Sequence, residues 1–194
     1  DDVKLKSKLK EVFGYSQFRG NQEAIIHNII AGNNTFVIMP TGAGKSLCYQ
    51  LPAIALPGTA IVISPLIALM KDQVEGLRRK NITAFAIHSG LQRRDVINTL
   101  KVAGESNCKF LFVSPERLET ALFKEYLPGL GVCLLAVDEA HCISQWGYDF
   151  RPPYLRIADL RKDLRGIPVL ALTASATPSV QGDICEKLEF TEPR

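Results

Sequence analysis

The sequence predicts an α/β fold, with a mostly parallel central β-sheet and helices on both faces. Two observations predict this fold. Short β-branched or aromatic runs alternate with longer amphipathic stretches throughout the 194 residues, as in right-handed βαβ crossovers. A glycine-rich loop also follows the first of these runs, and a pair of carboxylates follows a later one. Parallel sheets bind ligands at the carboxyl ends of their strands, so the functional residues are expected there.

Two helices are expected ahead of the first strand. Apolar residues recur at helical spacing over 5–13 and again over 24–30. Gly14 follows the first run, and Gly32 follows the second, where it suits a helix C-cap. His27 lies in the middle of the second apolar run, so we interpret it as a structural residue.

Six short runs rich in β-branched and aromatic residues are expected to form buried strands. The stretches between them, such as 66–77 and 96–100, place apolar residues on one helical face. The six expected strands are Thr35–Met39, Thr59–Ile63, Ala84–Ile87, Phe110–Val113, Leu134–Val137 and Val169–Leu172.

The composition indicates one globular domain over residues 1–194. Apolar residues make up 46% and charged residues 22% of the chain, which is close to the globular average and unlike a disordered segment. No apolar run approaches the roughly 18 residues that a membrane-spanning helix requires, so no membrane partner is expected. Neither end has the character of a natural terminus, so the chain is expected to be part of a longer protein.

Cysteine usage and charge narrow the class of protein. The five cysteines are scattered and form no C-x-x-C pair, which favours a reducing, intracellular location and argues against a zinc site. The net charge of +3 is too small to indicate a nucleic-acid-binding protein. A nucleic-acid interface must therefore be predicted from local motifs.

A phosphate-binding loop is predicted directly after the first strand. Backbone amides near glycines can surround phosphate oxygens, the following helix adds its dipole, and Lys45 can reach the β and γ phosphates. The strict P-loop pattern has Gly where this chain has Met39, but the T-G-x-G-K-S core is intact. A glycine-rich turn with an incidental lysine is the alternative. The residues expected to contact the nucleotide here are Thr41, Gly42, Ala43, Gly44, Lys45 and Ser46.

A pair of acids follows the apolar run Leu134–Val137, which is a Walker B arrangement. Asp138 is expected to bind Mg²⁺ together with Ser46, and Glu139 to orient and deprotonate the attacking water. His141 is a further candidate catalytic or coupling residue, with a packing role as its alternative. We expect Lys45 and the two acids to meet across adjacent strand ends.

In this order the motifs resemble those of superfamily 2 helicases, and the chain is similar to the RecQ family along nearly its whole length. The resemblance implies a RecA-like P-loop domain that uses ATP and Mg²⁺. It further implies an ATP-dependent DNA helicase that moves 3′ to 5′ on single-stranded DNA and unwinds duplex DNA in repair and recombination. Such a protein is expected in the bacterial cytoplasm or nucleoid, or in a eukaryotic nucleus.

The segment Phe13–Arg19, with Gln22, resembles the part of RecQ proteins that binds adenine. The resemblance implies that Tyr15 and Arg19 sandwich the base and that Gln22 hydrogen-bonds to its edge. A ring, a flat guanidinium and an amide are chemically suited to these contacts. Phe13 and Phe18 are better interpreted as packing residues.

Three further segments resemble helicase motifs: motifs Ia and Ib, which contact nucleic acid, and motif III, whose hydroxyls link the ATP site to the nucleic-acid site. Ser64 begins motif Ia, Ser114 lies in motif Ib, and Thr173 and Ser175 lie in motif III. Hydroxyls and amides at such positions can hold a nucleic-acid backbone without reading bases. Without the resemblance, each Ser-Pro pair would indicate only the start of a helix.

The segment 142–152 resembles the aromatic-rich loop that couples DNA contact to ATP hydrolysis in RecQ proteins. Trp146, Phe150 and Arg151 are expected to contact single-stranded DNA, because stacking on bases compensates for exposed aromatic surface. A loop buried in the core is the alternative. RecQ proteins usually have His where this chain has Tyr148, and Tyr does not gain a proton near neutral pH.

The family pattern ends after Thr177, and no motif of a second lobe follows. In such helicases the second RecA-like lobe of the same polypeptide supplies an arginine finger. The isolated chain is therefore expected to bind nucleotide but to be nearly inactive. An RNA-remodelling helicase lobe and a non-catalytic nucleotide-binding module are the alternative functions.

Overall fold

The computed structural model describes residues 2–40, 43–118 and 120–190, apart from the side chains of residues 2, 43 and 120. The strands of these residues form one sheet in the order β1-β6-β5-β2-β4-β3, and every pair of neighbours is parallel. The strands are β1 (Thr35–Ile38), β2 (Thr59–Ile63), β3 (Ala84–Ile87), β4 (Phe110–Val113), β5 (Val132–Val137) and β6 (Val169–Thr173).

Helices connect the strands, and short helical turns lie near several strand ends. The longer helices are α1 (Asp2–Lys8), α2 (Gln22–Ile30), α3 (Ala43–Ala55), α4 (Ile67–Arg79), α5 (Arg93–Glu105), α6 (Thr120–Leu130), α7 (Leu155–Lys162) and α8 (Pro178–Lys187). The short ones are η1 (Leu9–Phe13), η2 (Pro115–Arg117), η3 (Ala140–Ile143) and η4 (Pro152–Tyr154).

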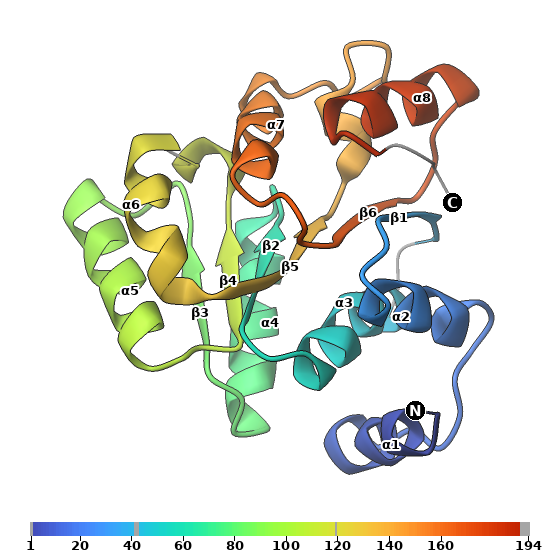
Figure 1. Ribbon diagram of the computed structural model, residues 1–194. Helices are drawn as coiled ribbons and strands as arrows, with labels where there is room; N and C mark the ends of the chain where they lie inside the picture. The colour runs from blue at the N-terminus through green and yellow to red at the C-terminus, as the bar shows by residue number, and fades with distance from the viewer. Residues whose placement is uncertain (1, 41–42, 119, 191–194) are drawn as a thin grey trace.

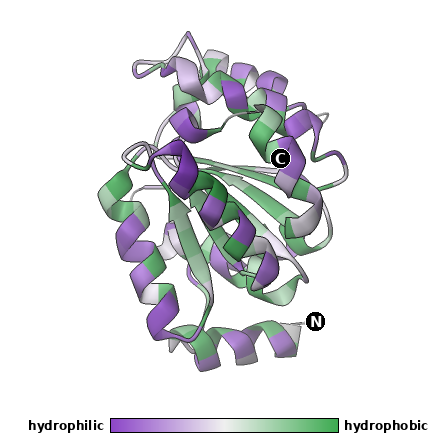
Figure 2. Cartoon of the chain, turned by 90° about the vertical axis from the view of Figure 1, so that its left-hand side faces the viewer, coloured by the Kyte–Doolittle hydropathy of each residue, from purple (hydrophilic) through white to green (hydrophobic). Residues whose placement is uncertain are grey.

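The sheet lies between two helical layers (Figure 1). On one face, α5, α6, α7 and α8 pack in a core that includes Ile61 and Ile63. On the other face, α2, α3 and α4 pack against residues of the opposite parity, such as Ala60 and Val62. Both faces of each central strand are therefore apolar, as expected for a parallel sheet covered on both sides. Figure 2 shows the result as mainly hydrophobic strands between helices that are polar on their outer sides.

The N-terminal helix lies outside these layers. Leu5 and Leu9 pack on Ile26, Leu47 and Leu51, so that α1 and η1 cover α2 and α3 and do not contact the sheet core. The run ends at Gly14, which has φ +78°. This left-handed conformation is easily adopted only by glycine and directs the chain towards α2.

The predicted fold class is confirmed, including the two opening helices and all six strands, whose bounds differ by no more than two residues at either end. The expectation that Lys45 and the acids lie across adjacent strand ends is wrong. Strand β6 lies between β1 and β5. The chain order cannot reveal this, because a strand that comes last can insert at any position in a parallel sheet.

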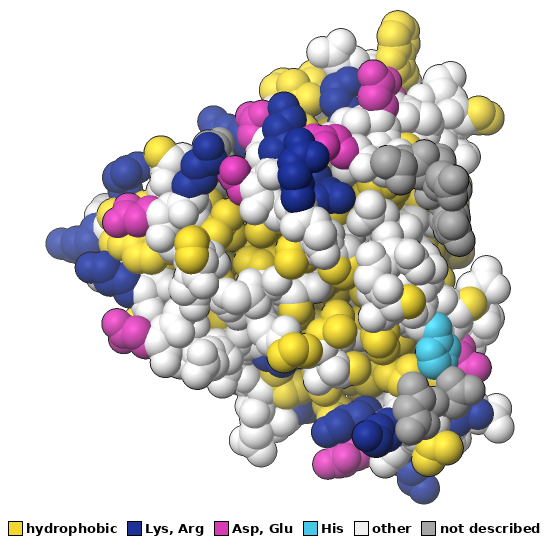
Figure 3. All heavy atoms as spheres, in the orientation of Figure 1, with side chains coloured by type: hydrophobic (Ala, Val, Ile, Leu, Met, Phe, Trp, Pro, Cys, Tyr) yellow, Lys and Arg dark blue, Asp and Glu magenta, His cyan; other side chains and the backbone are white. Residues whose placement is uncertain are grey.

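The surface has mixed charge. Figure 3 shows basic and acidic side chains interspersed on one face, with several Lys and Arg side chains gathered over α7. This agrees with the small net charge of +3. Among the described residues, the helices are too short or too polar to cross a membrane.

Candidate functional site

A lysine and two acids meet at the carboxyl edge of the sheet. Lys45 lies in the first turn of α3, and Asp138 and Glu139 directly follow β5. The Lys45 ammonium is 2.7 Å from Asp138 Oδ1 and 3.7 Å from Glu139 Oε1. Lys45 and Asp138 are only 7% and 8% exposed. A buried ammonium and a buried carboxylate stabilise each other, whereas each alone would be strongly disfavoured.

The backbone around the acids is held in an unusual shape. Glu139 has φ 52° and ψ 44°, a left-handed conformation that is uncommon for a residue other than glycine. Its N–H donates to Asp138 Oδ1 at 2.9 Å. The hydroxyl of the fully buried Tyr154 donates to the Asp138 carbonyl oxygen at 2.9 Å. Burial raises the pKa of Tyr154, so this hydroxyl keeps its proton and remains a donor.

Ser46 belongs to a chain of polar side chains that links two helices. Gln73 of α4 donates to Ser46 Oγ at 2.7 Å, and Gln50 of α3 donates to Gln73 Oε1 at 2.5 Å. Tyr49 adjoins the same hydroxyl. Burial raises the pKa of Tyr49, a hydrogen bond with Ser46 lowers it, and the negative charge of Asp138 raises it again.

The residues that the family resemblance assigns to adenine also come together. Tyr15, Arg19 and Gln22 line a pocket beside Gly44 and Leu47. The Arg19 backbone N–H donates to Gln22 Oε1 at 2.8 Å, and Gln22 Nε2 donates to the Gly44 carbonyl oxygen at 3.1 Å. Gln22 therefore already ties this segment to the phosphate loop.

Strand β6 links the acids to the segment that follows it. His141 Nδ1 is 2.7 Å from Thr173 Oγ1, and His141 Nε2 is 3.7 Å from Glu139 Oε2. Thr173 Oγ1 in turn donates to the Ser175 carbonyl oxygen at 3.2 Å. The inserted strand thus places Thr173 beside His141, and His141 beside the acids.

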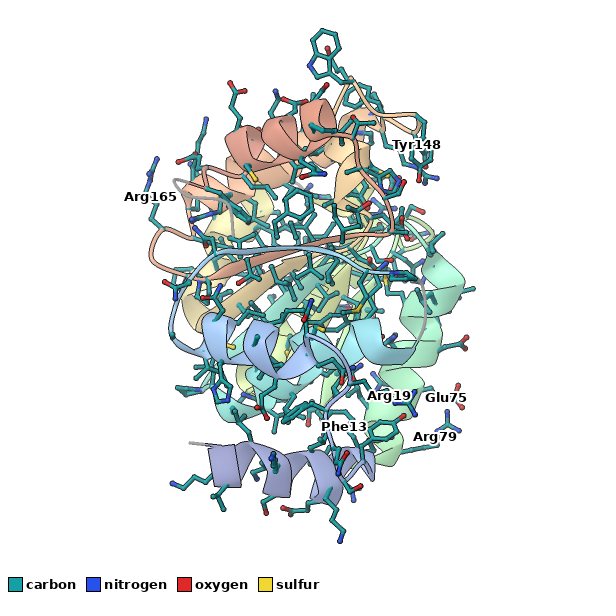
Figure 4. All side chains as sticks on the ribbon, turned by 90° about the vertical axis from the view of Figure 1, so that its right-hand side faces the viewer. Phe13, Arg19, Glu75, Arg79, Tyr148 and Arg165 are labelled. Atoms are coloured by element: carbon teal, nitrogen blue, oxygen red, sulfur yellow. The ribbon has the colours of Figure 1, made fainter. Side chains whose placement is uncertain are left out.

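The aromatic loop after η3 projects from this edge. Trp146 and Tyr148 are 75% and 76% exposed, and Tyr148 still stacks on His141 with ring centroids 5.0 Å apart and planes 14° apart. Figure 4 shows Tyr148 at this edge of the molecule. Phe150 and Arg151 are half-buried, and Arg151 lies 3.4 Å from Asp149. An exposed tryptophan therefore lies two residues before the tyrosine that stacks on the histidine beside the acids.

Comparison with known proteins agrees with this geometry. The model of the family described as DEAD/DEAH box helicase matches residues 19–183. The chain belongs to this family. Within it, the RecQ resemblance is confirmed by curated relatives. The chain is 48% identical over 189 residues to the ATP-dependent DNA helicase RecQ of Bacillus subtilis, covering 96% of this chain and 32% of that protein.

A second relative is the ATP-dependent DNA helicase Q5 of Rattus norvegicus, to which the chain is 44% identical over 199 residues. This match covers 98% of the chain and 20% of that protein. The chain thus spans a third or less of the length of these relatives. Among solved structures, the helicase MrfA bound to DNA superposes with a TM-score of 0.74 at 19% identity, covering 98% of this chain and 28% of that one. The Hef helicase domain of Pyrococcus furiosus gives 0.65 at 22% identity, over 90% and 37%. These structures support the RecA-like fold.

The hydroxyls of two residues that are predicted to contact nucleic acid are buried. Ser64 and Ser114 are only 4% and 1% exposed. Ser64 Oγ accepts from the Leu66 N–H at 3.3 Å, and Ser114 Oγ has no partner among the described residues. Ser64 directly follows β2 and Ser114 directly follows β4, both inner strands of the sheet, which explains why their hydroxyls lie below the surface. Their contact with a nucleic-acid backbone stays a prediction.

His141, Cys142 and Asp149 form a compact group under the aromatic loop, with ligand atoms within 4.8 Å of one another. Burial raises the pKa of the Cys142 thiol to about 12, so it stays protonated near neutral pH. His141 is also engaged with Thr173. We therefore interpret the group as a packed junction that supports the loop.

Some site residues were predicted from the sequence and others were not. The structure brings together Lys45, Asp138, Glu139 and His141 at one edge. Thr41, Gly42 and the side chain of Ala43 lie outside the described residues. Gln50, Gln73 and Tyr154 were missed, because a glutamine in an amphipathic helix and a tyrosine after two prolines carry no distinctive local pattern.

Proposed function

We propose that this chain is the ATP-binding motor lobe of a DNA helicase, in which ATP hydrolysis drives movement along single-stranded DNA and the separation of duplex DNA. The observation that supports it best is the 2.7 Å contact between Lys45 and Asp138, because it joins a phosphate-binding lysine to a metal-binding acid at one edge of the sheet. The proposed 3′ to 5′ direction and the role in DNA repair and recombination rest on the family resemblance alone.

The side chains at this edge divide the chemistry of ATP hydrolysis between them. Lys45 can leave Asp138 to neutralise the β and γ phosphates. Glu139, which is 3.7 Å from the same ammonium, can orient a water molecule and accept its proton. His141 contacts Glu139 and Thr173, so it can relay a change at the acids to β6. Little covalent chemistry is required, because phosphoryl transfer depends mainly on positioning and charge neutralisation.

The donor set also fits Mg²⁺. A serine hydroxyl and a carboxylate are oxygen ligands that this hard cation prefers, so Ser46 and Asp138 would hold it. When bound, Mg²⁺ supplies positive charge that offsets the charge of the phosphates. Ser46 lies one residue after Lys45, and its hydroxyl is already held by Gln73.

The pocket of Tyr15, Arg19 and Gln22 is the proposed adenine site. Tyr15 is 47% exposed, so its ring face is open to a base. Gln22 has used its carbonyl oxygen on Arg19 and one amide hydrogen on Gly44. One hydrogen and one lone pair remain, which is enough for a donor and an acceptor contact with adenine.

The proposed DNA path crosses the aromatic loop. Trp146 is 75% exposed and can stack on bases, and the half-buried Phe150 and Arg151 belong to the same loop. Thr173 and Ser175 connect this region to His141. The segments resembling motif Ia and motif Ib, which contain Ser64 and Ser114, are proposed to contact the DNA backbone along the same path. A second RecA-like lobe of the same polypeptide is the proposed partner on the nucleotide side.

Replacement of Lys45 tests the proposal. The unaltered chain should bind a fluorescent, non-hydrolysable ATP analogue, and Lys45→Ala should weaken this binding roughly 10-fold to 100-fold, because charge-assisted hydrogen bonds to phosphate are lost. The control is Lys101→Ala, an exposed lysine of α5. Thermal unfolding of both variants checks their fold. Unchanged affinity in Lys45→Ala would contradict the proposal.

The nucleic acid is tested separately in a protein that contains both lobes. Stimulation of ATP hydrolysis by single-stranded DNA, and not by RNA of the same length, is expected. Stronger stimulation by RNA would favour an RNA-remodelling helicase. Nucleotide binding without hydrolysis, with or without either nucleic acid, would favour a non-catalytic nucleotide-binding module.

A further inference from the structure

Three side chains from two helices form a continuous hydrogen-bond chain that ends on Ser46. Gln50 Nε2 donates to Gln73 Oε1 at 2.5 Å, and Gln73 Nε2 donates to Ser46 Oγ at 2.7 Å. Gln50 is 9% exposed and Gln73 is half-buried, so water competes little with these bonds. The chain joins α3, which carries the phosphate-loop lysine, to α4, whose first part belongs to the segment resembling motif Ia.

The chain has a definite direction. An amide group has a donor end and an acceptor end. Gln50 presents its NH₂ group to Gln73, so the Gln73 carbonyl oxygen must face Gln50. The Gln73 NH₂ group therefore faces Ser46, and it can only donate to that hydroxyl. Gln50 thus fixes which end of Gln73 reaches Ser46.

A donor at this position orients the serine hydroxyl. A hydroxyl oxygen has two lone pairs and one hydrogen. Gln73 occupies one lone pair. One lone pair of Ser46 is left.

We propose that Gln73 is a positioning residue for Ser46, and that the Gln50–Gln73 pair turns the remaining lone pair of Ser46 towards a divalent cation bound with the nucleotide. The inference rests on the proposed nucleotide site. It adds a residue of α4 to a site otherwise built from the phosphate loop and the acids. A shift of α4 along its axis would then alter how Ser46 holds the cation.

The test measures how strongly Mg²⁺ and nucleotide assist each other's binding. Gln73→Met keeps the length and approximate volume of the side chain and removes both hydrogen bonds. The affinity for the fluorescent ATP analogue is measured with Mg²⁺ and with EDTA. We expect Gln73→Met to leave the affinity in EDTA unchanged and to weaken the affinity in Mg²⁺ roughly fivefold, the effect of one hydrogen bond. Gln50→Met should act in the same direction and less strongly.

A double-mutant cycle separates positioning from packing. In the Ser46→Ala background, Gln73→Met should have no further effect on the Mg²⁺ dependence, because the hydroxyl that it orients is absent. Asp72→Asn, on the exposed side of the same helix, is the matched control and should behave like the unaltered chain.

Each outcome decides the proposal. An unchanged Mg²⁺ dependence in Gln73→Met, or an equal loss in the Ser46→Ala background, overturns the positioning role while leaving the nucleotide site intact. Failure of the unaltered chain to bind nucleotide overturns the proposed function and this inference with it. If Gln73→Met does not fold, Gln50→Met, compared in the same two backgrounds, gives the decision.

Discussion

Gly44 lies where the phosphate loop meets the proposed adenine pocket. A Cβ atom built on Gly44 would lie 2.8 Å from Gln22 Nε2, and that nitrogen donates to the Gly44 carbonyl oxygen. The absence of a side chain at Gly44 leaves room for Gln22 to dock on the loop. Gln22 therefore joins the proposed base-binding pocket to the proposed phosphate-binding loop.

Gly44→Ala tests this arrangement. The added methyl group should displace the Gln22 amide and weaken binding of the ATP analogue roughly fivefold or more, through loss of about one hydrogen bond. Gly76→Ala is the matched control, because a Cβ at Gly76 meets nothing within 4 Å and Gly76 lies inside α4. The control should stabilise the chain by up to about 1 kcal/mol in thermal unfolding. Equal nucleotide affinity in both variants would rule out the shared role.

The aromatic loop packs closely against η3, the short helix from which it emerges. A Cβ on Gly147 would lie 3.1 Å from the His141 carbonyl oxygen, so the loop passes close over η3. Tyr148 then stacks on the His141 ring and Trp146 is left free. The two aromatic residues therefore differ in their surroundings: Tyr148 contacts the histidine beside the acids, and Trp146 faces solvent.

Trp146→Ala is expected to weaken binding of single-stranded DNA by roughly 1–3 kcal/mol, the contribution of one stacked base. Affinity for the ATP analogue should stay the same, because Trp146 does not line the proposed nucleotide pocket. Trp146→Phe, which keeps an aromatic face, should restore most of the DNA affinity. Fluorescence anisotropy with a labelled oligonucleotide gives both values. If Trp146→Ala instead lowers the affinity for the ATP analogue and leaves DNA binding unchanged, the assignment of Trp146 to the DNA path is wrong.

The elements of this fold could be predicted because each has a local pattern. β5 is an uninterrupted apolar run, and α4 repeats apolar residues every three or four positions. The order of the strands has no such pattern, and neither does the bond between Gln73 and Ser46, which lie 27 residues apart. The P-loop and the acids could be predicted because their chemistry requires particular residue types. Ser64 and Ser114 show the limit, since the sequence does not reveal that their hydroxyls are buried.

For the whole molecule, the prediction concerns turnover. The chain spans a third or less of the curated relatives described above, and we propose that a second lobe completes the catalytic site. Loss of an arginine finger reduces the rate on the order of 10³–10⁵-fold in comparable enzymes. The chain alone should therefore bind nucleotide yet hydrolyse ATP slowly, with or without DNA, in a steady-state phosphate-release assay. Turnover near that of a two-lobed helicase would show that the site is complete in one lobe.

The position of β6 also bears on how the protein is made. Strand β1 lies at the edge of the sheet and has β6 as its neighbour, with Thr35 opposite Leu170. On the ribosome, the nascent chain can pair β2 with β4 and β5 well before residue 170 emerges, but β1 has no strand to join until then. The segment that leads into Lys45 is thus among the last to be locked into the sheet. Premature termination before β6 is expected to yield a product in which β5, β2, β4 and β3 can pair and β1, which leads into the proposed phosphate loop, has no partner strand.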